Sequence, residues 1–168
     1  LSFKQLTDFM PDSAPAQFLY AESLALSGDM DHASQALKRA IELNAEYLPA
    51  RVGEIKMLVN NGEVAKAKER LPALRAEFGG RPEVLGIEGW FALGTGDFVT
   101  AADRFSSLLE NQQDSEIMVL YVRSLWGQKK YDEAIERMQR WLQEQPKDLG
   151  VAMHLAGFPG RVAHVPPA

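Results

Sequence analysis

The chain has 168 residues, of which 46% are hydrophobic and 24% charged, a composition typical of a folded protein and not of a disordered one. Its formal net charge of −5 argues against a nucleic-acid partner, and no apolar run approaches the roughly 18 residues that suggest a membrane span. Cysteine is absent, which excludes disulfides and thiolate metal sites but leaves the compartment open.

Residues 1–13 form the first predicted element. Phe3, Leu6 and Pro11 are in register with the later second helices of a repeat, so we interpret this segment as the end of a preceding repeat. The chain starts at Leu1 without a recognisable signal sequence. We therefore expect a piece of a longer array, with capping repeats and any targeting signal outside it.

A 34-residue period organises the next part of the chain. Three glycines recur at this interval, and so do three alanines, each five residues after a glycine: Gly28, Gly62, Gly96, Ala33, Ala67 and Ala101. A fixed period of this length is typical of stacked helix pairs. It predicts repeats at 14–47, 48–81 and 82–115, and a fourth at 115–148 that is one residue short because Ala134 comes early.

Each repeat is predicted to contain a first helix, a tight turn and a second helix. Glycine suits the turn because it reaches positive φ without a Cβ clash. Apolar residues spaced by three and four predict one buried stripe on the second helix. Its members after the alanines are Leu37, Ala40, Leu71, Leu74, Phe105, Leu108, Met138 and Trp141. Pro72 lies inside one of these helices and predicts a kink or an early end.

Residues 149–157 are predicted to open the first helix of a fifth repeat. We expect this helix to expose Val151 and Leu155, as the segment at the other end exposes Phe3 and Leu6, so that head-to-tail self-association is open to the chain. Residues 158–168 have no helical pattern, and their prolines and glycine predict a loop or disordered tail.

The chain resembles the tetratricopeptide repeat (TPR) family. The resemblance rests on the run Gly96-Asp97-Phe98-Val99-Thr100-Ala101, on Tyr131-Asp132-Glu133-Ala134, and on Pro146 near the end of the fourth repeat. The tryptophan expected early in the first helix is replaced by Gln17, Arg51, Leu85 and Met118. The closing proline is replaced by Ala45, Gly79 and Gln113. The resemblance implies an all-α fold, a right-handed α-solenoid of four full repeats with partial repeats at both ends.

A more distant resemblance is to the TPR proteins of bacterial exopolysaccharide and PEP-CTERM (exosortase) export systems. It rests on Leu48-Pro49-Ala50-Arg51, the short step into the fourth repeat, and Arg140-Trp141-Leu142 before Gln145-Pro146. It implies a scaffold at the bacterial envelope or in the periplasm. A generic bacterial TPR adaptor, with the cytoplasm as its compartment, is the alternative.

In TPR arrays, family geometry places positions two, five, nine and twelve of each repeat on a concave groove. The resemblance therefore implies a partner-binding groove formed by Phe18, Glu22, Lys56, Trp90, Leu93, Arg123 and Trp126. Aromatic and arginine side chains dominate binding energy at interfaces, and a carboxylate of a bound peptide would meet Arg123. The alternative is that Trp90 and Trp126 only pack between helices. The chaperone-type carboxylate clamp is absent, because its lysine and asparagine positions hold Phe18 and Glu22.

No arrangement of residues predicts catalysis. His32, His154 and His164 have no metal-ligand partner at helical spacing, and no nucleophile elbow or phosphate-binding loop occurs. Glu54 and Glu88 are in phase, and we expect them to be solvated or paired with arginine. We therefore expect no enzyme activity, cofactor or metal site.

The predicted function is a non-enzymatic scaffold or adaptor that binds a protein or peptide segment in the groove. The alternative is a structural spacer or a regulatory arm within a longer multi-repeat protein.

Overall fold

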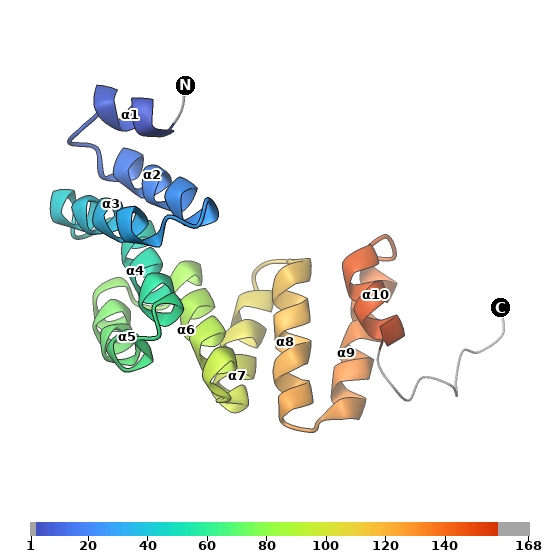
Figure 1. Cartoon of the computed structure of the whole chain (residues 1–168). Helices are drawn as coiled ribbons and strands as arrows, with labels where there is room; N and C mark the ends of the chain where they lie inside the picture. The colour runs from blue at the N-terminus through green and yellow to red at the C-terminus, as the bar shows by residue number, and fades with distance from the viewer. Residues whose placement is uncertain (1–2, 158–168) are drawn as a thin grey trace. The chain divides into compact units, whose positions relative to one another are not determined.

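The structure is a computed structural model that describes residues 3–157, with side chains from Gln5 onward, and this part of the chain contains helices and no strand. Figure 1 shows the helices in chain order. Their bounds are α1 Phe3–Phe9, α2 Ala14–Leu26, α3 Met30–Leu43, α4 Leu48–Asn60, α5 Val64–Phe78, α6 Pro82–Thr95, α7 Phe98–Leu109, α8 Ser115–Gly127, α9 Tyr131–Glu144 and α10 Leu149–Gly157. The all-α prediction is confirmed. The predicted tail, 158–168, and the side chain of Phe3 lie outside the described residues.

The chain divides into two compact units, with the boundary inside α6. Unit 1 comprises residues 1–87 and unit 2 residues 88–168. In unit 1, α2 packs on α3, α3 on α4, and α4 on α5. In unit 2, α7 packs on α8, and α8, α9 and α10 pack on one another. Each unit is therefore a stack of neighbouring helix pairs, as the period predicts.

Helix starts coincide with the repeat frames. The first helices α2, α4, α6 and α8 begin at Ala14, Leu48, Pro82 and Ser115, where the four frames begin. Side chains before the helices provide caps: Ser13 accepts a hydrogen bond from the backbone N–H of Ala16 at 3.3 Å, and Asp97 from that of Thr100 at 3.1 Å. The same cap chemistry recurs at Asp29, Asp114 and Asp148.

The turn between the two helices of a repeat requires positive φ. Gly28, Gly62 and Gly96 have φ of 84°, 79° and 82° at this position. In the fourth repeat the equivalent residue is Lys129, with φ of 62°. A side chain with a Cβ is strained there, so this turn keeps the geometry of the other three at a cost in free energy.

Replacing Lys129 by glycine is expected to raise the free energy of unfolding of unit 2 by about 0.5–1 kcal/mol, because relief of the left-handed strain exceeds the entropy that glycine adds to the unfolded chain. Urea unfolding followed by tryptophan fluorescence measures this, since Trp90, Trp126 and Trp141 all lie in unit 2. Lys130→Gly is the control. It removes the same charge at an ordinary φ of −87°, where no left-handed strain is relieved, and is expected to change the free energy of unfolding by less than about 0.5 kcal/mol because glycine is well accepted at an N-cap. An equal change in both variants would contradict the strain argument.

The core follows the predicted stripe. The four alanines of the period, Ala33, Ala67, Ala101 and Ala134, have no exposed surface. The large residues of the stripe are also buried in unit 2: Phe105, Leu108, Met138 and Trp141. In α5, Pro72 is exposed and the helix continues past it to Phe78, so the alternative of an early helix end is wrong.

The prediction of an exposed apolar face on the last helix is wrong. Val151 and Leu155 are 0% and 1% exposed, because α10 packs on both α8 and α9. The apolar residues that α10 does expose are Leu149 and Met153. At the other end Leu6 is half-buried against α2, and Phe9, at 76% exposed, is the more open residue.

Candidate functional site

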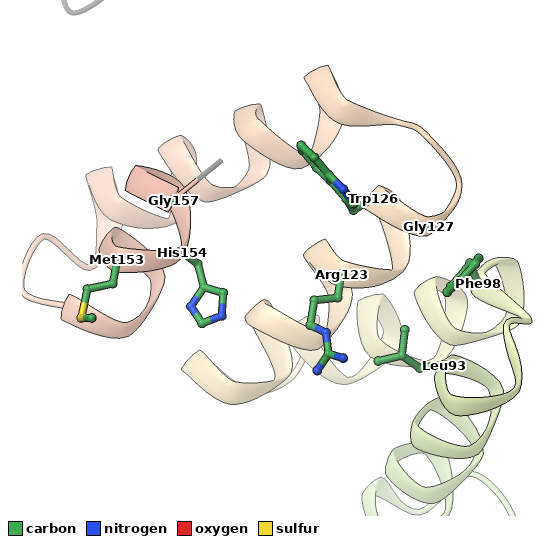
Figure 2. Close-up of a pocket in the computed structure, with 8 residues that line it drawn as sticks. All are labelled: Leu93, Phe98, Arg123, Trp126, Gly127, Met153, His154 and Gly157. Carbon is green, nitrogen blue, oxygen red and sulfur yellow. The ribbon is translucent and has the colours of Figure 1, made fainter. Parts of the chain in front are cut away.

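The first helices of unit 2 line a cavity of about 770 Å³, within the range of binding sites for small ligands and peptide side chains. Its lining residues come from α6, α8, α10 and the first residue of α7: Leu93, Phe98, Arg123, Trp126, Gly127, Met153, His154 and Gly157. Figure 2 shows them, with Phe98 and Leu93 on one side, Arg123 and Trp126 on α8, and Met153 and His154 on α10. We call this the unit 2 cavity.

A close approach between α7 and α8 shapes one wall of the unit 2 cavity. A Cβ added at Gly127 would overlap the ring carbons of Phe98, so the aromatic ring rests directly on the glycine backbone. The Gln128 side chain donates a hydrogen bond from Nε2 to the carbonyl of Phe98 at 2.9 Å. The start of α7 and the end of α8 are thereby held together at this wall.

Trp126 combines packing with access to the cavity. Its ring lies 4.4 Å from that of Tyr131, centroid to centroid, at an interplanar angle of 59° across the α8–α9 turn. The side chain is half-buried and also lines the cavity. The indole is therefore supported on one side by Tyr131, which pre-organises it as an aromatic wall.

The polar groups of the unit 2 cavity carry no negative charge. No lining residue is acidic, and Arg123 is exposed without a hydrogen bond or ion pair to any residue in the described part of the chain. His154 donates from Nδ1 to the carbonyl of Gly150 at 3.0 Å, which leaves Nε2 as its second polar atom. The cavity is thus an apolar space with a cation at its edge.

The first helices of unit 1 line a second cavity, of about 500 Å³, which we call the unit 1 cavity. Phe18, Glu22 and Lys56 line it, on α2 and α4. Gly53 on α4 makes room for its floor, since a Cβ there would lie 3.1 Å from Leu37 Cδ1 and 3.2 Å from Phe18 Cε2. Phe18 also packs edge-on against Tyr47, with ring centroids 5.8 Å apart.

The predicted groove residues fall into two groups. Phe18, Glu22 and Lys56 meet in the unit 1 cavity, and Leu93, Arg123 and Trp126 meet in the unit 2 cavity. Trp90 is half-buried on α6 and lines neither cavity. Sequence reasoning missed Phe98, Met153 and His154 as lining residues. Position within the repeat could have found Met153, which is position five of a repeat that begins at Leu149, because α10 is a first helix like α6 and α8. His154 is position six and has no such signal.

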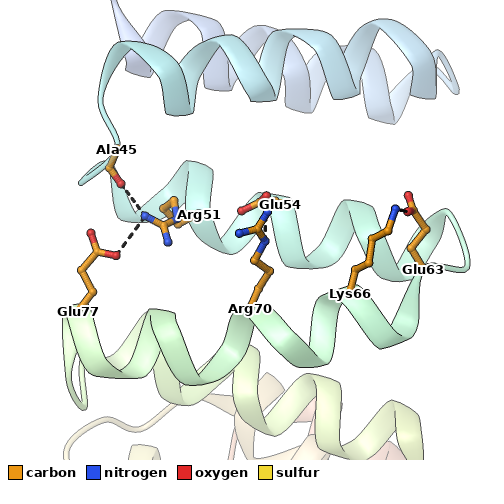
Figure 3. Close-up of polar contacts among 7 residues, drawn as sticks. All are labelled: Ala45, Arg51, Glu54, Glu63, Lys66, Arg70 and Glu77. Atoms are coloured by element: carbon orange, nitrogen blue, oxygen red, sulfur yellow. Dashed lines mark hydrogen bonds and ion pairs between the residues drawn. The ribbon is translucent and has the colours of Figure 1, made fainter.

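The in-phase carboxylates pair with arginines, as predicted. Glu54 lies 3.6 Å from Arg70 in unit 1 (Figure 3), and Glu88 lies 2.6 Å from Arg104 in unit 2. The two pairs occupy the same two positions of successive repeats. At these positions in the fourth repeat, Arg137 lies over the ring of Tyr121, 5.8 Å from its centroid. These residues therefore join the first and second helix of a repeat.

The histidine and acidic side chains of the described residues are candidate metal ligands. They form no cluster of three or more that could hold a metal ion. His32 is engaged with Asp29, its N-cap residue, at 2.8 Å, and this hydrogen bond lowers the pKa of the Asp29 carboxyl. No helix within residues 3–157 has the length and apolar character needed to cross a bilayer.

Comparisons with known proteins agree with this geometry. Residues 92–156 match the family model of the tetratricopeptide repeat. The comparison with curated proteins gives no match. Among solved structures, the APC/C hetero-tetramer Cut9-Hcn1 is similar over 92% of this chain, with 23% identity and a TM-score of 0.74, although the match covers 31% of that chain. The present chain thus spans about a third of that protein.

Two further solved structures match over most of both chains. PilW, described as a widely conserved type IV pilus biogenesis factor, is 15% identical over 91% of this chain and 72% of its own, with a TM-score of 0.74. YrrB, described as a TPR protein with an unusual peptide-binding site, is 16% identical over 90% and 78%, with a TM-score of 0.64. The sequence match supports tetratricopeptide repeats in residues 92–156, and the structural likeness shows a TPR-solenoid fold.

Proposed function

We propose, from this TPR-solenoid fold, that the chain is a non-enzymatic scaffold that binds a segment of a partner protein on the surface of its first helices. TPR proteins bind protein or peptide partners, and the first helices line both cavities of this chain. The observation that carries the proposal is Arg123, which has no partner within the described residues and stands beside the aromatic wall of Trp126. Arginine and tryptophan are the residues most enriched among interface hot spots.

The setting of this function stays a prediction. The likeness to PilW shows a shared fold and no shared role. A role in the bacterial export system suggested by Leu48-Pro49-Ala50-Arg51 and Arg140-Trp141-Leu142 is therefore a hypothesis, and so is the envelope or periplasm as compartment. Self-association through the ends also stays a prediction, with Leu149 and Met153 as the apolar residues that α10 offers.

The test compares capture from cell extract by the parent chain and by an Arg123→Glu/Trp126→Ala variant. Arg140→Glu/Val99→Ala is the matched control, because it makes the same kind of change at exposed residues outside the unit 2 cavity. The Arg123→Glu/Trp126→Ala variant alone is expected to lose more than about 2 kcal/mol of binding free energy, which is about a thirtyfold loss of affinity for the partner. Circular dichroism establishes that all three are folded. Equal capture by both variants would favour the spacer or regulatory arm.

A further inference from the structure

Arg123 has no carboxylate partner among the described residues, and it is the arginine that lines the unit 2 cavity. Five arginines of the described residues contact a carboxylate of the chain: Arg39, Arg51, Arg70, Arg104 and Arg140. Another, Arg137, lies over the ring of Tyr121. No residue that lines the cavity beside Arg123 is acidic, so we expect the counterion of Arg123 to come from another molecule.

We propose that the unit 2 cavity recognises an acidic–apolar peptide segment, in which an Asp or Glu carboxylate pairs with Arg123 while a neighbouring leucine-sized side chain packs on Trp126. This inference rests on the proposed function and names the chemistry of its partner. The expected ligand group is a carboxylate within a peptide chain, because the walls beside Arg123 are apolar and the cavity has room for more than one side chain.

Charge complementarity favours this occupant over a purely apolar one. A guanidinium presents a planar fork of N–H donors that matches the two oxygens of a carboxylate. Binding an apolar side chain alone would cover Arg123 without a partner, which costs free energy. A neighbouring carboxylate removes that cost, and the apolar walls reduce solvent screening around the ion pair.

His154 adds a polar contact of a different kind. Its Nδ1–H is committed to the Gly150 carbonyl, so in the neutral ring Nε2 is an acceptor. Figure 2 shows His154 on α10 and Arg123 on α8 extending to the same side of the helices that carry them. A peptide whose carboxylate meets Arg123 has backbone N–H groups close by, and one of these donates to Nε2 of His154.

Three amidated peptides test the inference directly. The first is acetyl-Gly-Leu-Glu-Leu-Gly-amide, the second replaces Glu by Gln, and the third replaces both leucines by alanine. Each is titrated into the ¹⁵N-labelled chain, and the indole N–H resonances of the three tryptophans are followed. Trp126 lines the cavity, whereas Trp90 and Trp141 do not and serve as internal controls.

The expected result is a movement of the Trp126 resonance alone, with the Glu peptide binding at least tenfold more tightly than the other two. Arg123→Gln is expected to equalise the Glu and Gln peptides. His154→Glu is expected to weaken the Glu peptide to the same extent, because the new carboxylate competes for Arg123. Arg140→Gln, an exposed arginine outside the cavity, leaves the preference unchanged.

Equal affinities of the Glu and Gln peptides, or an unmoved Trp126 resonance at millimolar peptide, would overturn the inference. The two proposals fail differently. If a partner is captured through Arg123 and Trp126 while the three peptides bind alike, the scaffold function stands and the acidic–apolar specificity is wrong. If capture and peptide binding are both absent, the proposed function is also wrong.

Discussion

Replacing Gly127 by alanine is expected to lower the free energy of unfolding of unit 2 by about 2–3 kcal/mol, near the upper end of the range for overpacking. The added Cβ would occupy the space of the Phe98 ring, which rests on the glycine. The ring has little freedom to retreat, since the Phe98 carbonyl is bound by the Gln128 side chain. Its open direction is into the unit 2 cavity, whose wall it forms.

Gly94→Ala is the matched control. It lies near the end of α6, as Gly127 lies at the end of α8, and apart from its chain neighbours and the backbone of its own helix no atom lies within 4 Å of an added Cβ. Because alanine favours a helix over glycine, this variant is expected to be neutral or more stable by up to about 1 kcal/mol. Urea unfolding followed by tryptophan fluorescence compares the two. Equal stability would show that the ring of Phe98 does not depend on Gly127.

The Gly127→Ala variant also links stability to binding. Where the protein remains folded at low temperature, the displaced ring fills part of the cavity, so the peptide that moves the Trp126 resonance is expected to bind more weakly. The control Gly94→Ala leaves that binding unchanged. Weaker binding in Gly127→Ala alone would show that Gly127, which is not one of the three glycines at 34-residue intervals, determines the shape of the binding surface.

The helices could be predicted from the sequence because the same residue types recur at the same positions of each repeat. A turn that needs positive φ recurs at Gly28, Gly62 and Gly96, and a close helix contact recurs at Ala33, Ala67 and Ala101. The same logic located the fourth turn at Lys129, where the residue type alone would not suggest positive φ. Local steric requirements can therefore be predicted when several copies of a repeat are compared.

The environment of the last helix could not be predicted in this way. Its neighbours were unknown from sequence, so Val151 and Leu155 were expected on the surface, whereas α8 and α9 cover them. This error also affected the prediction of the binding site. Because α10 was regarded as incomplete, Met153 and His154 were not considered as lining residues, although they complete the cavity next to Arg123.

Some ion pairs of this chain could be predicted from the sequence, and the absence of one could not. Glu54 and Glu88 were expected to be solvated or paired with arginine, and the partners that the structure gives them, Arg70 and Arg104, share their 34-residue spacing. The unpaired state of Arg123 has no such signature. It depends on the absence of acidic side chains from the lining of the unit 2 cavity, whose helices meet only in the folded unit.

Asp148 joins three helices of unit 2. Its Oδ2 accepts hydrogen bonds from Ser115 Oγ and Trp141 Nε1, both at 2.6 Å, and its Oδ1 accepts one from the backbone N–H of Val151 at 3.1 Å. These donors stand at the start of α8, near the end of α9 and in the first turn of α10. One carboxylate thus holds α10 where it forms a wall of the unit 2 cavity.

The protonation of Asp148 follows from these contacts. Partial burial acts to raise the pKa of the carboxyl, but the hydrogen bonds from Ser115, Val151, Trp141 and Gly150 outweigh it, so the pKa lies below its ordinary value. A carboxyl whose folded-state pKa is lowered contributes stability that is complete above its unfolded-state pKa of about 3.9. That contribution is lost as the pH falls through the folded-state pKa.

Asp148→Asn is therefore expected to lower the free energy of unfolding of unit 2 by about 2–3 kcal/mol at pH 7, since an amide cannot accept on both sides and turns its NH₂ group toward one set of donors. Asp132→Asn, an exposed carboxylate on α9, is the control, with a loss below about 1 kcal/mol. Because protonation removes the same contribution from the parent, the difference between parent and Asp148→Asn is expected to shrink below about pH 4. Urea unfolding at pH 7 and pH 3 measures both values. A loss no larger than that of the control, or a gap of the same size at pH 3, would show that α10 is held by its apolar contacts and that Asp148 adds little to them.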